Sequence, residues 1–355
     1  MTTHKLSKEL QEEYGEKDWE QTDEQLDQLV KSDQDGHREF VACFGRDKDL
    51  DILVHDESPL VRSCVAREGR NKDLDILVHD TNEDVRWWVA AQGRDKDLDI
   101  LVHDPDWKVR EKVAAQGRDK DLDILVHDES SNVRREILHL NNLPSKYLDV
   151  LVHDENPDVR VDVVDYGRDQ DLDILIQRDD VMEDWECWIV RYAIVWEGRD
   201  KDLDILVHDD DETVREAVAQ FGRDKDLDVL VHDSNWEVRR KVAAQGRDKD
   251  LDILVYDHDE DVRSAVARQG RDKDLDWLIH DKSALVRAAV ASCGRDKDLD
   301  ILVHDESPLV RSCVAREGRN KDLDILVHDD DKEVRGAVAK FGRDKDLDVL
   351  VNDSN

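Results

Sequence analysis

A 24-residue repeat constrains this chain more than any other feature of its sequence. Glycines recur every 24 residues from Gly45 to Gly117, and again from Gly198 to Gly342. Between them runs GRDKDLDILVHD, then three or four variable residues, then V-R-x-x-V-A-x-x-G. Residues 45–80 recur unchanged as residues 294–329. So short a period predicts an array of similar units that stack on one another, rather than a globular domain.

The first half of each repeat predicts a short helix. Leu50, Leu53 and Val54 lie at i, i+3 and i+4, which forms one apolar stripe. Asp47 precedes them as an expected N-cap, with two further aspartates in the first turn, where the helix dipole favours acids.

The second half predicts another helix. Val61, Val65 and Ala66 supply its inward face, and Gly69 is placed to end it in a left-handed conformation. Three residues before the first valine stands a good N-cap residue in every regular repeat. These residues are Ser58, Asn82, Asp106, Ser130, Asn156, Asp211, Asn235, Asp259, Ser283, Ser307 and Asp331.

Neither helix can bury its stripe alone, so neighbouring repeats must stack into one core. The sequence therefore predicts an all-α fold, a right-handed α-solenoid of about thirteen two-helix repeats. We expect residues 1–20 to form a capping helix and residues 21–355 a single solenoid. Irregular, inserted repeats fall at about 134–200, and a half repeat at 342–355. The apolar edge of that half repeat must be covered by the tail, by a second copy in a homodimer, or by the partner.

The repeat resembles the leucine-rich variant (LRV) repeats and, more broadly, the HEAT-like repeats. The shared elements are the paired apolar residues of LDILV, an acidic turn, and V-R-x-x-V-A at a 24-residue spacing over residues 21–355. The resemblance implies an α-solenoid in which the LDILV segment is a 3₁₀-helix. The sequence departs from the family at GRDKD, where a Pro-containing turn is common, and no segment matches the Cys-rich iron–sulfur region of some relatives. Architecture follows from the resemblance, but function does not.

The charge of the chain limits its partners. Ninety acidic residues against 53 basic residues give a formal net charge of -37. This argues against direct binding of nucleic acid or an anionic membrane, and it favours a basic protein partner. No apolar run approaches a membrane span and no signal peptide is readable, while the five cysteines share no metal-like spacing. A cytoplasmic location fits these features.

Residues that could carry chemistry are part of the repeat background. A His-Asp pair recurs once per repeat, which spaces successive histidines about 10 Å apart, too far to share a metal. These histidines either form the turn or make a pH-responsive row. The DKDLD run lacks the glycine and glutamate of a calcium loop. We therefore expect no catalytic residue, metal or cofactor and predict a non-enzymatic protein, with a HEAT-like lyase or glycosylase as an alternative.

A row of arginines, one per repeat, is expected to pair with aspartates of neighbouring repeats as a structural ladder, although a binding role is the alternative. Its members are Arg62, Arg86, Arg110, Arg134, Arg160, Arg215, Arg239, Arg263, Arg287, Arg311 and Arg335.

The aspartates of the DKDLD run, represented by Asp47, Asp49 and Asp51, form either a solvated face or a linear anionic array. Thirteen repeats span ~120 Å, so the net charge averages about one per 3 Å, against about one per 1.7 Å in duplex DNA. The array predicts a DNA mimic, of the kind a phage or mobile element uses for counter-defence, that binds and inhibits a basic nucleic-acid-binding protein. A general interaction scaffold, whose acidic coat serves solubility, is the alternative.

One region breaks the period and is rich in tryptophan. Aromatic and basic residues gather there, and this composition is typical of binding hot spots. They are Trp185, Trp188, Trp196, Tyr192 and Arg178. Trp107 and Trp236 share one repeat position just after the N-cap, where we expect exposure. These residues either contact the partner or pack inward to absorb a change in curvature.

Overall fold

The computed structural model describes residues 3–5, 20–44, 46–177 and 187–351. Contacts divide the chain into two compact units, Met1–Arg178 and Asp179–Asn355. In the described residues of both units, a first helix of each repeat alternates with a second helix. Each unit is defined by the contacts within it. That the two units form a single solenoid over residues 21–355 therefore stays a prediction.

The first unit contains seven first helices and six second helices in its described residues. The first helices are α2 (Asp23–Leu29), α4 (Asp47–Leu53), α6 (Asn71–Leu77), α8 (Asp95–Leu101), α10 (Asp119–Leu125), α12 (Ser145–Leu151) and α14 (Asp169–Gln177). The second helices are α3 (Asp35–Ala42), α5 (Pro59–Glu68), α7 (Glu83–Ala91), α9 (Trp107–Ala114), α11 (Ser131–Leu138) and α13 (Pro157–Tyr166).

The second unit follows the same plan. Its second helices are α15 (Cys187–Glu197), α17 (Glu212–Phe221), α19 (Trp236–Ala244), α21 (Glu260–Arg268), α23 (Ala284–Ala291), α25 (Pro308–Arg316) and α27 (Lys332–Phe341). Its first helices are α16 (Asp200–Leu206), α18 (Asp224–Leu230), α20 (Asp248–Leu254), α22 (Asp272–Leu278), α24 (Asp296–Leu302), α26 (Asn320–Leu326) and α28 (Asp344–Leu350).

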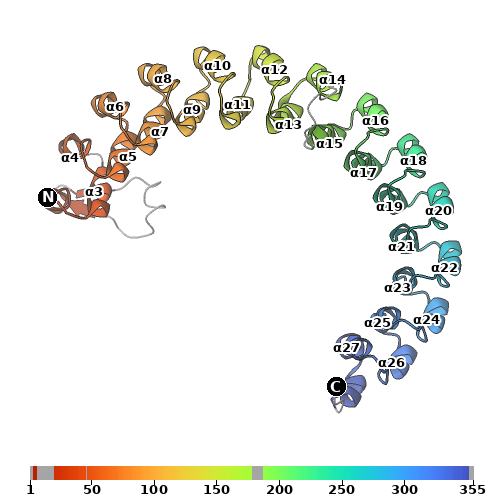
Figure 1. Ribbon diagram of the computed structural model, residues 1–355. Helices are drawn as coiled ribbons and strands as arrows, with labels where there is room; N and C mark the ends of the chain where they lie inside the picture. Colours follow the sequence, from red (N-terminus) through yellow and green to blue (C-terminus); the bar gives the residue numbers. More distant parts are fainter. Residues whose placement is uncertain (1–2, 6–19, 45, 178–186, 352–355) are drawn as a thin grey trace. The chain divides into compact units, whose positions relative to one another are not determined.

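Within each unit, second helices pack most closely on the second helices of neighbouring repeats. The odd-numbered helices thus form the inner row of a unit and the even-numbered helices the outer row (Figure 1). The core lies between the rows, where Leu50, Leu53 and Val54 meet Val61 and Val65, all buried. The predicted stripes are confirmed, and the architecture is an all-α repeat solenoid.

The second helices begin and end as their sequences predict. All eleven expected residues, from Ser58 to Asp331, are N-caps. The Asn82 side chain, for example, accepts hydrogen bonds from the backbone N–H groups of Asp84 and Val85. Gly69 ends α5 at a φ of 72°, a left-handed conformation that favours glycine.

The first helices differ from expectation in two ways. The LDILV segment is α-helical and not 3₁₀. Its backbone makes i to i+4 hydrogen bonds, such as the one from Leu50 N–H to the Arg46 carbonyl at 3.0 Å. Bonds of the i to i+3 type occur at the two ends, for example Asp49 N–H to the Arg46 carbonyl at 2.9 Å and Asp56 N–H to the Leu53 carbonyl at 3.0 Å. The N-cap is Arg46 instead of Asp47, which is the first helical residue.

The N-terminal capping helix that we predicted over residues 1–20 is wrong at its described ends. Thr3–Lys5 (β1) and Glu20–Thr22 (β2) are strands that pair antiparallel, with Thr3 opposite Thr22. The rest of that prediction lies outside the described residues.

A ladder of Arg–Asp ion pairs ties eleven of the thirteen described second helices to the next repeat. Arg62 Nε and Nη2 donate to the Asp80 carboxylate at 2.6 and 2.9 Å, and Nη1 donates to the Asp56 carbonyl at 2.7 Å. Asp80 also accepts the Asn82 N–H at 2.9 Å, so the aspartate of each His-Asp pair shapes the turn. Equivalent pairs are Arg38–Asp56, Arg86–Asp104, Arg110–Asp128, Arg134–Asp154, Arg191–Asp209, Arg215–Asp233, Arg239–Asp257, Arg263–Asp281, Arg287–Asp305 and Arg311–Asp329. Two further arginines donate to backbone carbonyls, Arg160 to Asp154 and Arg335 to Asp329.

Candidate partner-binding face

A second network of ion pairs runs along the first helices, which we call the rim. Its centre is the arginine of the GRDKD run. Arg70 Nε donates to Asp73 of its own helix at 2.6 Å, while Nη1 reaches Asp47 of the preceding repeat at 2.8 Å. Nη2 lies 2.9 Å from Asp51, which Lys72 also contacts. One guanidinium therefore holds three carboxylates from two repeats.

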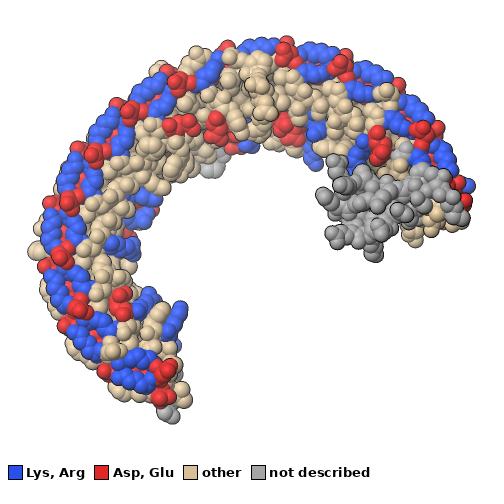
Figure 2. Space-filling view, turned by 180° about the vertical axis from the view of Figure 1, so that it is seen from behind, with Lys and Arg blue, Asp and Glu red and all other residues tan. Residues whose placement is uncertain are grey.

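This network changes the interpretation of the aspartate array. Asp49 is buried at 2% exposure and pairs with Arg46, so it is not part of a surface. Asp47 and Asp51 keep side-chain exposures of 85% and 51%, yet both pair with an arginine. Hydrogen bonds from Lys72 and Arg70 outweigh partial burial and hold the pKa of Asp51 below its usual range. Basic and acidic side chains consequently alternate along the rim (Figure 2).

A second set of exposed acidic residues lies in the turn between the two helices of a repeat. We call these residues the turn edge. The residue after the His-Asp pair is strongly exposed, at 89% for Glu57, 85% for Glu129, 92% for Asp210 and 87% for Glu306. Each of these carboxylates still lies within 3.6 Å of a ladder arginine. The turn edge thus resembles Asp47 of the rim: both present exposed carboxylates that pair with an arginine.

The inner row of helices carries a different surface, which we call the second-helix face. Each second helix contributes three residues to it. The first stands two positions before the valine of the V-R pair, and the other two follow it four and eight positions later. In α15 these residues are Trp188, Tyr192 and Trp196. The ring centroids lie 5.9 Å and 6.1 Å apart along the helix, both edge-on, and Trp196 is 48% exposed. The structure thus brings three of the predicted aromatic residues into one stripe.

The structure describes only some of the other residues that the sequence predicted for partner binding. Trp185 and Arg178 lie outside the described residues. Trp107 and Trp236 are the first residues of α9 and α19, and each is 36% exposed, as expected. They occupy the repeat position of Trp188, which sequence reasoning overlooked because the inserted residues hid the alignment.

Cations accompany the aromatic residues on several second helices. On the first unit, Arg67 of α5 lies 5.6 Å from the Trp88 ring centroid, and Lys112 of α9 lies 4.8 Å from that of Trp87. On α19, Arg240 lies 5.7 Å from the Trp236 ring centroid. Such pairs keep large rings ordered at a partly exposed surface.

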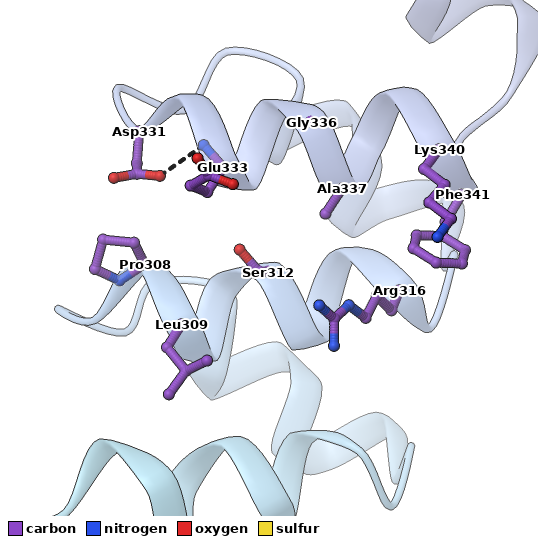
Figure 3. A pocket seen from close by; sticks show the side chains of 10 residues that line it. All are labelled: Pro308, Leu309, Ser312, Arg316, Asp331, Glu333, Gly336, Ala337, Lys340 and Phe341. Carbon is purple, nitrogen blue, oxygen red and sulfur yellow. Dashed lines mark hydrogen bonds between the residues drawn. The ribbon is translucent and has the colours of Figure 1, made fainter.

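A groove of about 810 Å³ opens between α25 and α27 (Figure 3). Pro308, Ser312 and Arg316 line one wall. The other wall is low, because Gly336 and Ala337 stand at its centre. Asp331 and Glu333 lie at one end, and Arg316, Lys340 and Phe341 at the other (Figure 3). Sequence reasoning missed this groove.

The apolar edge predicted for the half repeat is present in α28. Leu347 and Val349 are exposed, and Val351 just beyond the helix is more exposed still. What covers this edge, including a second copy of the chain, stays a prediction.

None of the helices that the structure describes has the length and apolar character needed to cross a membrane. Within the same residues, histidine, cysteine and acidic side chains form no group of three or more that could hold a metal ion.

No protein-family model and no curated protein matches this sequence. Among solved structures, the chain is similar to a leucine-rich repeat variant with a repetitive structural motif, at 23% identity over 74% of this chain and 88% of that one, with a TM-score of 0.40. It is also similar to importin beta (12% identity, 92% and 50% coverage, TM-score 0.22). A third similar structure is a designed armadillo repeat protein in complex with the peptide (KR)4 (13% identity, 92% and 98% coverage, TM-score 0.10). The paired helices of its described repeats show by themselves that the chain is an α-solenoid repeat protein.

Proposed function

We propose that this chain is a non-enzymatic binding protein that holds a protein partner along its second-helix face. One observation carries the proposal. The repeats are nearly invariant in their core and rim, whereas the second-helix face differs from helix to helix. It is Trp, Tyr and Trp on α15, but Trp, Arg and Ala on α19 and Pro, Ser and Arg on α25. A surface that varies on an otherwise constant frame is suited to reading different parts of one partner.

The partner that we propose is basic. The net charge of -37 attracts cations, and the turn edge presents exposed carboxylates such as Glu57 and Asp210 beside the second helices. Aromatic residues on the second-helix face would supply the affinity, because large rings dominate the binding energy of most interfaces. The turn edge would steer the encounter and add a salt-dependent contribution.

A narrower version makes the partner a nucleic-acid-binding protein that the chain inhibits as a DNA mimic. Only the net charge supports it. The rim aspartates that were to supply the anionic array pair with arginine and lysine, and the exposed acids of the turn edge also pair with ladder arginines, so neither surface is a row of bare negative charges. A general scaffold is the competing function, and salt separates them. An electrostatic inhibitor loses affinity steeply between about 0.1 M and 0.5 M salt, whereas an aromatic-anchored scaffold does not.

The test compares the removal of one aromatic triplet with the removal of one aromatic pair, by quantitative capture of partner proteins. The test variant replaces Trp188, Tyr192 and Trp196 with alanine. The matched control removes the exposed aromatic pair of the rim, Tyr256 and Trp277, whose rings lie 5.4 Å apart. Changing these two to His and Ile restores the residues that other repeats carry.

We expect the α15 variant to lose the partner by about tenfold or more in affinity, because three hot-spot rings are removed. The rim control should retain it. Unchanged binding by a correctly folded α15 variant, together with loss in the rim control, would move the partner to the outer row and refute the proposal.

A further inference from the structure

The exact duplication in the sequence provides an internal template for the α25–α27 groove. Helices α5 and α25 have the same sequence, and so do the residues that flank them. The next second helix, α7 or α27, differs between the two copies. Where α7 has Trp87 and Trp88, α27 has Gly336 and Ala337. The same first wall is therefore seen once with aromatic side chains beside it and once without them.

In the first unit, the space is filled by the chain itself. Trp88 lies with its ring centroid 5.6 Å from the Arg67 guanidinium, and Arg67 is only partly exposed. Burial also raises the pKa of the adjacent Glu68. The indole thus covers the end of α5, and its flat face satisfies the arginine by a cation–π contact.

In the second unit, the same space is open. Arg316, the counterpart of Arg67, is exposed. A Cβ placed on Gly336 would meet nothing within 4 Å, and the groove of about 810 Å³ lies there. Figure 3 shows Arg316 reaching along the groove floor with Ala337 opposite, and no ring between them.

The charges at the groove ends give a direction. Arg316 and Lys340 lie at one end with the Phe341 ring, and Asp331 and Glu333 at the other (Figure 3). Ala337 and Glu333 are four residues apart on α27, about 6 Å along the helix axis. An extended segment covers that length in about two residues.

We propose that this groove binds an aromatic side chain of a partner segment, stacked on Arg316 beside Ala337, with a basic residue two positions away that pairs with Glu333 and Asp331. The partner's ring takes the place that Trp88 holds in the first unit. This inference rests on the proposed function and names the recognition element: an aromatic-x-basic segment of a basic protein. The aromatic residue of the segment is inferred from the position of the chain's own Trp88. The basic residue is inferred from the negative charge of Glu333 and Asp331.

The experiment titrates the synthetic peptide acetyl-Gly-Trp-Gly-Arg-Gly-amide into the full chain, with binding followed by calorimetry and by NMR of labelled alanine methyl groups. Peptides with Leu in place of Trp, and Glu in place of Arg, are the controls. Ala337→Trp reproduces Trp88 and closes the groove. The pair Trp87→Gly with Trp88→Ala reproduces Gly336 and Ala337 in the first unit and opens an equivalent groove, whose acidic end is Asp84 in place of Glu333.

We expect one site in the wild type, with the Ala337 methyl shifted and the Ala289 methyl of α23 unchanged. Both control peptides should bind about tenfold more weakly or worse. Ala337→Trp should lose the site while keeping its helical content and melting temperature, and the tryptophan-to-small pair should raise the stoichiometry from one to two. The gain of a site does not depend on the folding of the Ala337→Trp protein.

Three results would overturn the inference: no binding up to millimolar peptide, equal binding of the leucine peptide, or unchanged affinity in folded Ala337→Trp. None of them bears on the proposed function, because capture by the α15 stripe is measured separately. If the α15 variant loses capture of the partner but the groove does not bind the peptide, the partner still binds the second-helix face. Only the inference about this groove would then be refuted.

Discussion

Replacing Arg263 with methionine breaks one rung of the Arg–Asp ladder while keeping most of the apolar stem. Arg263 of α21 donates to both carboxylate oxygens of Asp281 in the next repeat, at 2.6 and 2.9 Å, and to the Asp257 carbonyl at 2.7 Å. The two charged side chains are only 6% and 8% exposed. Removing the arginine therefore strands a carboxylate that water reaches poorly.

The expected cost is large for a single substitution. Deleting one partner of a buried ion pair costs about 3–5 kcal/mol, because the remaining charge loses its compensation. Asp281 keeps one hydrogen bond, from the Ser283 N–H at 2.8 Å, which places the estimate toward the lower end of that range. The matched control is Lys273→Ala. Lys273 pairs with Asp252 at 2.5 Å, but the side chains are 61% and 51% exposed, so we expect a loss of ~1 kcal/mol or less.

Hydrogen exchange is the appropriate assay, because long repeat arrays do not unfold as a single cooperative unit. Arg263→Met should reduce the opening free energy of amides in α21 to α23, with smaller changes in distant repeats. Lys273→Ala should leave the map almost unchanged. Equal, small effects of the two substitutions would refute the structural role of the ladder.

Three further predictions concern stability. For five ladder aspartates, Asp281 among them, burial raises the pKa, but arginine and backbone N–H donors outweigh it and leave the pKa below its usual value. The stabilisation from these aspartates is complete above the unfolded pKa of about 3.9 and is lost as pH falls through the folded pKa values. Urea midpoints should therefore fall as the pH drops below 4, and a rise in the midpoint there would contradict the assignment. Gly270→Ala, at a φ of 73° with open space around its Cβ, should lower the opening free energy of the preceding helix by about 1 kcal/mol in hydrogen exchange. Gly198→Ala should cost more because its Cβ would lie 2.5 Å from an aromatic ring atom, and equal costs would contradict the predicted clash. Asn82→Ala removes a side-chain cap bond and should lower the opening free energy of α7 by about 1 kcal/mol in hydrogen exchange. Ser130→Ala, whose side chain makes no such bond, should have a smaller effect on α11, and the reverse order would count against the cap geometry.

The helices could be predicted from the sequence because their signals are local. The N-cap before each second helix, the apolar residues at helical spacing and Gly69 at the left-handed end all act within one repeat. The 3₁₀ expectation failed because it came from a resemblance and not from the residues. Nothing in DKDLDIL prevents i to i+4 bonding.

The surfaces could not be predicted as well, because they depend on how one repeat sits on the next. Arg70 reaches Asp47 and Asp51 across a repeat boundary, at a separation of 23 and 19 residues that no local pattern reveals. The R-x-x-D spacing of Arg70 and Asp73 was a visible signal for the buried carboxylate. The replacement of Trp87 and Trp88 by Gly336 and Ala337 after an identical segment was the visible signal for the groove.

The most direct test of the account is a hydrogen-exchange and side-chain footprint of the chain in complex with its captured partner. We predict protection along the odd-numbered helices, strongest at α15 and at the α25–α27 groove, with the rim residues of the even-numbered helices unchanged. Protection confined to the rim, with the second-helix face as accessible as in the free chain, would contradict the central claim.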